Sequence, residues 1–178
     1  TKDQGGSDFR LLQISNIGVG EFIETGNFRF VSQETFERLN CTEILPDDVL
    51  VARMPTPIGR AWRAVSMPWR MITAVDVAII RPNKDVLLPL VLTQMWNEPQ
   101  NLNRIAAQAS GTTRLRITRR ELAALEFVVP DMKVQLQFDR MVRPVFELVG
   151  ALRSQTTILQ SARDVLLPRL LSGQIEVK

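Results

Sequence analysis

The residues of this chain that could do chemistry are mainly arginines. The chain has 18 arginines and four lysines, but no histidine, no tyrosine and a single cysteine, Cys41. The lack of histidine excludes nucleophiles of the Ser-His and Cys-His kinds and zinc sites of the Cys/His type. We therefore expect no catalytic residue, no metal and no cofactor. This composition favours a binding protein over an enzyme.

The arginines are grouped along the sequence. Residues 49–75 and 99–120 together hold nine arginines and no acid, whereas residues 21–48 hold seven acids and two arginines. The planar guanidinium suits phosphate and guanine better than a lysine ammonium does. This separation of charge predicts a face that binds a polyanion. The alternative is that these arginines pair with acids distant in the sequence.

Two polar turns carry arginines that could meet such a partner. Prolines in the turn at 53–60 reduce the conformational freedom that binding would cost. The turn at 109–116 places small hydroxyls beside two arginines, a combination suited to phosphates and base edges. The candidate contact residues in and around these turns are Arg53, Thr56, Arg60, Arg63, Thr112, Thr113, Arg114 and Arg116.

The elements that position these turns are short and mixed. Apolar clusters between turn residues predict strands at 10–17, 28–31, 49–53, 61–66, 74–81 and 125–129. Capping and periodicity predict helices at 33–39 after Ser32, at 86–96 after Asp85, at 101–109, and at a capping box of Thr118 and Glu121. Since no regular βαβ alternation is visible, we expect a compact α+β domain over residues 1–130.

After Pro130 the pattern changes to one long helix, predicted over residues 131–173 and followed by a tail at 174–178. Pro144 and Pro168 are sites where this helix could kink or divide. A seam with spacings of three and four predicts coiled-coil pairing with another long helix. Its members are Val145, Leu148, Leu152, Gln155, Leu159, Ala162 and Leu166. The alternative is that the helix folds back over its own domain.

The C-terminal helix also carries a specific motif. The run ARDVLLPRLLSG at 162–173 closely resembles the helical region that ends the specificity subunits of type I restriction-modification systems. Residues 12–18, 45–53, 58–60, 111–113 and 125–130 resemble, in the family's order, parts of its target recognition domain. The chain departs from the family at Asp47, where glycine is usual. It departs again at Pro130-Asp131-Met132-Lys133, where the family has Pro-Pro-x-x-Glu-Gln.

The resemblance implies a function and a set of partners. It implies sequence-specific recognition of duplex DNA through the two turns, with catalysis left to methyltransferase and restriction subunits. It also implies that the chain corresponds to half of a subunit, the C-terminal half. Its helix would then pair with a second long helix, which in isolation is that of another copy in a homodimer.

A second class of function remains open. The chain could be a non-catalytic dimerising adaptor, or an antagonist fragment, that binds partner subunits without reading DNA. In either case we expect a cytoplasmic protein without membrane contact. No apolar run in the sequence approaches the ~20 residues of a membrane span, and no signal peptide is visible.

Overall fold

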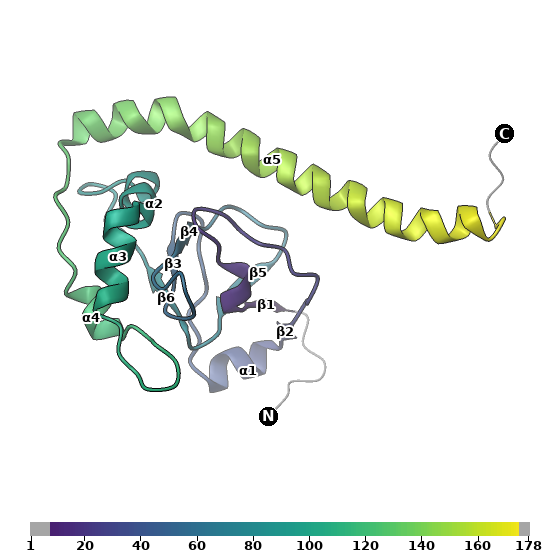
Figure 1. The fold of residues 1–178 in the computed structure, drawn as a ribbon, viewed down its shortest axis with the longest axis horizontal. Coiled ribbons are helices and arrows are strands. Elements are labelled where there is room, and N and C mark those ends of the chain that lie inside the picture. The colour runs from purple at the N-terminus through teal and green to yellow at the C-terminus, as the bar shows by residue number, and fades with distance from the viewer. Residues whose placement is uncertain (1–7, 175–178) are drawn as a thin grey trace. The chain divides into compact units, whose positions relative to one another are not determined.

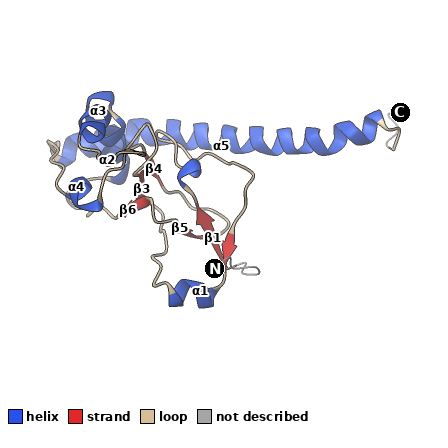
Figure 2. Ribbon diagram, turned by 60° about the horizontal axis from the view of Figure 1, so that its bottom comes forward, coloured by secondary structure: helices blue, strands red, loops and turns tan. Residues whose placement is uncertain are grey.

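The computed structural model describes residues 8–174 and divides into two compact units, Thr1–Asp139 and Arg140–Lys178. Figure 1 traces the chain and Figure 2 colours it by secondary structure. The elements are β1 (Phe9–Leu12), the 3₁₀ helix η1 (Ile14–Asn16), β2 (Phe30–Val31), α1 (Gln33–Arg38), β3 (Val49–Ala52), β4 (Ala61–Arg63), β5 (Arg70–Thr73), β6 (Val77–Ile80), α2 (Pro89–Asn97), α3 (Pro99–Ala107), α4 (Arg119–Ala123) and α5 (Met132–Leu171). The predicted α+β class with a long C-terminal helix is confirmed.

Two sheets of three strands form the framework of the first unit. One has the order β2-β1-β5, with β1 antiparallel to β2 and parallel to β5; the other has the order β4-β3-β6 and is antiparallel throughout. All four residues of β3 are buried. Because side chains alternate across a strand, Val49 and Val51 enter one core while Leu50 and Ala52 enter another.

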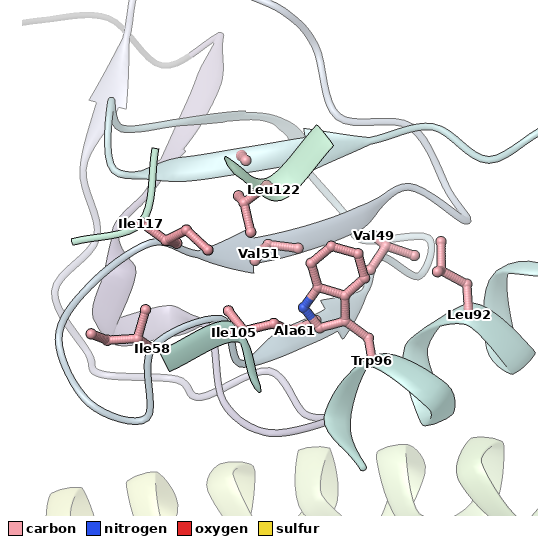
Figure 3. Close-up of a cluster of buried hydrophobic side chains, with 10 residues drawn as sticks. Val49, Val51, Ile58, Ala61, Leu92, Trp96, Ile105, Ile117 and Leu122 are labelled. Carbon is pink, nitrogen blue, oxygen red and sulfur yellow. The ribbon is translucent and has the colours of Figure 1, made fainter. Parts of the chain in front are cut away.

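The first of these cores holds the two arginine-bearing turns in place. It packs side chains of β3 against Trp96 of α2 and Ile105 of α3 (Figure 3). Ile58 from one turn and Ile117, next to the other, belong to the same cluster and are 3% and 0% exposed. Each turn is therefore anchored at one end by a buried isoleucine.

Several predicted strands are shorter in the structure or absent. The strand expected at 10–17 stops at Leu12, where the chain turns into η1 and the Gln13 amide donates to the Asn16 side chain (2.9 Å). The segment 125–129 is not a strand: Leu125 and Phe127 pack against the first core without strand pairing, and the Phe127 ring centroid lies 5.3 Å from that of Trp96. Strand β5 was not predicted at all.

The helix signals were more reliable than the strand signals. Ser32 caps α1, and the capping box of Thr118 and Glu121 opens α4. The Thr118 amide donates to the Glu121 carboxylate (2.6 Å), which lowers the pKa of this carboxyl. Helix α2, however, begins at Pro89 and not at residue 86, because proline is favoured at the first helical position. Asp85 is therefore not its cap.

Helix α5 runs unbroken from Met132 to Leu171, with both prolines inside it. Its first turn is held by Gln135, which is 1% exposed. The Gln135 side-chain oxygen accepts from the Leu88 amide (2.9 Å), and its amide nitrogen donates to the carbonyls of Val86 (3.0 Å) and Pro130 (2.8 Å). Apart from residue 174, the predicted tail lies outside the described residues. In the part of the chain that the structure describes, no helix is both long and apolar enough to cross a membrane.

Candidate nucleic-acid interface

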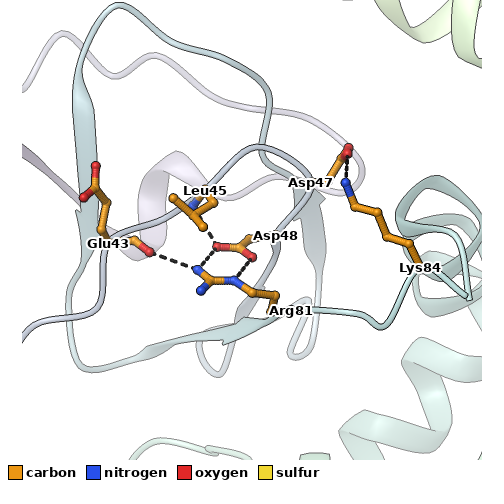
Figure 4. Close-up of polar contacts among 6 residues, drawn as sticks. All are labelled: Glu43, Leu45, Asp47, Asp48, Arg81 and Lys84. Carbon is orange, nitrogen blue, oxygen red and sulfur yellow. Dashed lines mark hydrogen bonds and ion pairs between the residues drawn. The ribbon is translucent and has the colours of Figure 1, made fainter.

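The fold pairs charges that the sequence keeps apart. Acids of the segment 43–48 meet arginines from the first acid-free window: Arg70 donates to Glu43 (2.6 Å) and Arg63 to Asp47 (2.8 Å). Figure 4 shows that Arg81 and Lys84 reach the same segment, at Asp48 and Asp47 respectively. Arg63 and Arg70 therefore follow the alternative interpretation, in which arginines pair with acids distant in the sequence. Neither presents a free guanidinium.

Asp47 has an unusual backbone conformation. Its φ of +76° lies in the left-handed region, where a glycine costs nothing and other residues are strained. Burial alone would raise the pKa of Asp47, but hydrogen bonds from Lys84 and Arg63 hold it below its usual value. These two ion pairs hold the Asp47 side chain in place at this backbone conformation.

Arg60, a predicted contact residue, is buried beneath the first turn. It is 8% exposed, and burial lowers its pKa. Its guanidinium donates to the carbonyls of Ile17 (2.6 Å), Ile14 (3.0 Å), Pro55 (2.7 Å) and Pro57 (3.2 Å). Arg60 thus ties the turn to the segment 14–17, and its donors are used within the protein.

Arg53 does the same for the second turn. It is 7% exposed and donates to the carbonyls of Ile117 (2.9 Å) and Val75 (3.2 Å). Its pKa is lowered, chiefly by burial and then by the positive charges of Arg116 and Arg119. Both arginines therefore lie under the surface, where they hold the backbone of the turns in position. Sequence reasoning did not separate them from exposed arginines, because arginine side chains are mostly exposed and nothing in the sequence marks these two as exceptions.

The two turns meet at one groove of about 750 Å³. Its lining residues come from η1 with the residue before it, from the two turns, and from the β5–β6 connection: Gln13, Ile14, Ser15, Met54, Pro55, Thr56, Asp76, Thr113, Arg114 and Leu115. Three of the predicted contact residues, Thr56, Thr113 and Arg114, are thereby brought together. The convergence of the two turns is the arrangement that a reading surface requires.

Arg114 is the predicted arginine that is both exposed and in the groove. Among residues 8–174, no hydrogen-bond or ion-pair partner holds its guanidinium. The backbone of Ser110 and Arg116 pairs across the base of its turn (3.0 and 3.1 Å), which fixes the loop that presents it. Arg116 itself is partly buried and pairs with Asp76 of the groove (2.5 Å), while Thr112 is exposed on the same turn.

Sequence reasoning missed the contribution of η1. Gln13, Ile14 and Ser15 line the groove, but they belong to the apolar-rich segment 10–17 that the sequence predicts as a strand. The exposed Arg29 contacts Gln13 as well. When the Gln13 side-chain amide is oriented to suit its neighbours, the Gln13 side-chain oxygen accepts from Arg29 Nε at 2.8 Å. Arg29 sits in the acid-rich window of the sequence, so composition gave no signal for it.

The predicted pairing residues share one strip of α5. From Val145 to Leu166 they alternate at spacings of three and four, and all seven are exposed. The apolar members include Leu148, Leu152 and Leu159, which are 59%, 52% and 69% exposed. A helix with exposed leucines at this spacing has a face suited to a second helix.

Within the described residues, no group of three or more Cys, Asp or Glu is arranged to hold a metal ion. The groove offers guanidinium donors, hydroxyls, an amide and apolar side chains, together with the Asp76 carboxylate, which is paired with Arg116. This set can bind a charged polymer and distinguish the edges of its bases.

Comparison with known proteins identifies the fold. No protein-family model and no curated protein sequence matches the chain. Two solved structures resemble it at 18% sequence identity each. One is a chain from a study of complex assembly and conformational transition of the type I R-M system, with a TM-score of 0.61 over 96% of this chain and 44% of that chain. The other is the HsdS subunit from Thermoanaerobacter tengcongensis, with a TM-score of 0.60 over 90% of this chain and 41% of that one.

This likeness defines a class of fold, an α+β domain joined to a long helix. More particularly, the fold is that of the HsdS specificity subunits of type I restriction-modification systems, as the sequence resemblance predicted. The chain spans less than half the length of either solved chain.

Proposed function

We propose that this chain reads one half of a bipartite target in duplex DNA, as part of the specificity subunit of a type I restriction-modification complex. The observation that carries the proposal is the groove in which both predicted turns meet. Methyltransferase and restriction subunits would be its partners and supply catalysis in the cytoplasm, while this chain supplies recognition. The HsdS-like fold supports the proposal, since the groove belongs to the part of the chain that resembles a recognition domain.

Within this proposal the predicted contact residues divide into two groups. Arg114, Thr113 and Thr56 of the groove contact DNA directly, with Thr112 and Arg116 beside them. Arg53 and Arg60 position the turns and do not touch DNA, because both are almost completely buried and donate to carbonyl groups of the protein. Arg63 has no direct role here, since it pairs with Asp47 and does not line the groove.

Arg114→Ala is expected to weaken specific binding by about 1–3 kcal/mol, which is roughly 5–150-fold. The reason is that an unpaired guanidinium in the groove is free to donate to guanine or to phosphate. The cognate duplex is first selected from a randomised library with the wild-type protein, and affinities are then measured by fluorescence anisotropy at several salt concentrations. A smaller salt dependence in the variant would identify a phosphate contact, and a relaxed base preference would identify a base contact.

The matched control is Arg38→Ala, which removes an exposed arginine of α1 outside the groove. It should bind as the wild type does. If Arg114→Ala also binds the selected duplex with wild-type affinity, Arg114 is not a contact residue. If the library yields no enriched sequence, the adaptor alternative replaces DNA reading.

The exposed strip of α5 supports the second part of the proposal, pairing with another long helix. In the isolated chain we expect a homodimer. Leu148→Glu combined with Leu159→Glu should give a monomer whose first unit unfolds as in the wild type, because these side chains lie in the exposed seam and outside the cores. Sedimentation velocity measures the change.

The control for this pair is Thr157→Glu with Gln160→Glu, which adds the same charge to exposed positions outside the seam. This control should remain dimeric. A double-leucine variant that sediments as the wild type does would rule out the seam as the interface.

A further inference from the structure

The groove contains apolar side chains that phosphate binding does not explain. Ile14, Met54, Pro55 and Leu115 line it beside the donors described above. Leu115 is 52% exposed and stands between Arg114 and Arg116 in the turn. An exposed leucine gains free energy only when a partner covers it.

The position of Leu115 is fixed by the backbone. The paired amides and carbonyls of Ser110 and Arg116 close the turn (3.0 and 3.1 Å), and the adjacent Ile117 is fully buried in the first core. Leu115 therefore cannot turn inward without breaking these contacts. Its side chain is presented at the groove together with the guanidinium of Arg114.

Duplex DNA offers few apolar groups to such a side chain. Phosphates are charged, and the edges of the bases carry donors and acceptors; in the major groove the apolar group is the C5-methyl of thymine. A leucine next to an arginine is therefore complementary to a thymine whose neighbouring base or phosphate accepts a hydrogen bond. The leucine would pack on the methyl group and the arginine would donate to the neighbour.

We infer that Leu115, with Met54 on the facing turn, contacts a thymine methyl in the major groove, so that the half-site read by this chain contains thymine beside the position contacted by Arg114. This inference rests on the proposed function and specifies the base that the same groove prefers. Leu115 and Met54 are specificity-determining residues in this assignment, while Arg114 supplies the polar contact.

The test compares the duplex selected by the wild-type chain with a set of duplexes. In each duplex of the set, deoxyuridine replaces one thymidine of the half-site. Removal of one methyl should weaken binding about fourfold at one position, which corresponds to the roughly 0.8 kcal/mol of a buried methyl or methylene group. Leu115→Ala should reduce this ratio, and Leu115→Ala combined with Met54→Ala should bind the thymidine and deoxyuridine duplexes equally, because both side chains that sense the methyl are then removed. Arg114→Ala should keep the fourfold ratio although its affinity is lower.

Val128→Ala, which shortens a 90% exposed valine outside the groove, is the apolar control and should keep both the affinity and the ratio. Unfolding curves for Leu115→Ala should match the wild type, since this side chain is outside the cores. Equal binding of the thymidine and deoxyuridine duplexes by the wild type, or a selected half-site without thymine, overturns the inference while leaving the proposed function intact. Failure to select any duplex refutes the proposed function itself.

Discussion

Arg60→Ala is expected to lower the free energy of unfolding by about 3 kcal/mol and to loosen the turn at 54–59. The guanidinium of Arg60 is 8% exposed and donates to four backbone carbonyls, from Ile14, Ile17, Pro55 and Pro57. Hydrogen bonds from a charged group each contribute about 1.5–3 kcal/mol. The expected loss of stability is smaller than the sum of the four hydrogen-bond contributions, because the wild type also carries the desolvation cost of burying the charged guanidinium.

Urea unfolding followed by tryptophan fluorescence measures this change, and hydrogen exchange locates it. Amides of residues 14–17 and 54–59 should exchange faster in the variant, since Arg60 joins these two segments. The stability of Arg60→Lys should fall between those of the wild type and Arg60→Ala. The lysine ammonium has only three donors and lacks the planar fork with which the guanidinium reaches four carbonyls. Arg114→Ala is the matched surface control and should unfold as the wild type does.

The same variant separates positioning from contact. Arg60→Ala should lose affinity for DNA together with stability, whereas Arg114→Ala should lose affinity alone. If Arg60→Ala unfolded as the wild type does and lost only DNA binding, Arg60 would be a contact residue. The assignment of Arg60 as a buried residue that positions the turn would then be wrong.

Gly59→Ala is expected to destabilise the fold by about 3 kcal/mol. Gly59 has φ +84°, which costs an L-residue about 1–2 kcal/mol. A Cβ at this position would also lie 2.5 Å from Cγ2 of Ile105, whose side chain is fully buried in the first core. Overpacking of this kind costs about 1–3 kcal/mol, because a β-branched side chain in a close-packed core cannot rotate away.

Gly26→Ala is the matched control for the backbone part of this cost. Gly26 has φ +69° but nothing within 4 Å of a Cβ. It should therefore lose only about 1 kcal/mol. Thermal unfolding by circular dichroism compares the two variants. Equal losses would show that the contact with Ile105 adds nothing.

Gly59 also matters for the groove because it ends the first turn against the core. Its amide donates to the Ala52 carbonyl (2.8 Å) and its carbonyl accepts from the Trp96 indole (2.7 Å). A shift here would move Pro55 and Thr56, which line the groove. We therefore expect DNA affinity to fall together with stability in Gly59→Ala, which is the result expected for Arg60→Ala as well.

The candidate site could be predicted in part. Both turns were found, because prolines, glycines and small hydroxyls around arginines have local signatures. The residues of η1 were missed, because a short apolar-rich segment such as 10–17 fits a strand as well as a short helix. The contact of Arg29 with Gln13 of the groove was missed, because Arg29 lies in a segment rich in acids.

The sequence by itself determined the features that depend on near neighbours: the caps of α1 and α4, the 40-residue helix with its apolar seam, and the two arginine-bearing turns. Tertiary structure alone decided which arginines remain free. Arg53, Arg60, Arg63 and Arg70 find carbonyls or acids far along the chain, while Arg114 lies exposed in the groove. The physical reason is that a charge is neutralised by whatever group lies within a few ångströms in space, and this distance is set by the packing of the sheets and helices.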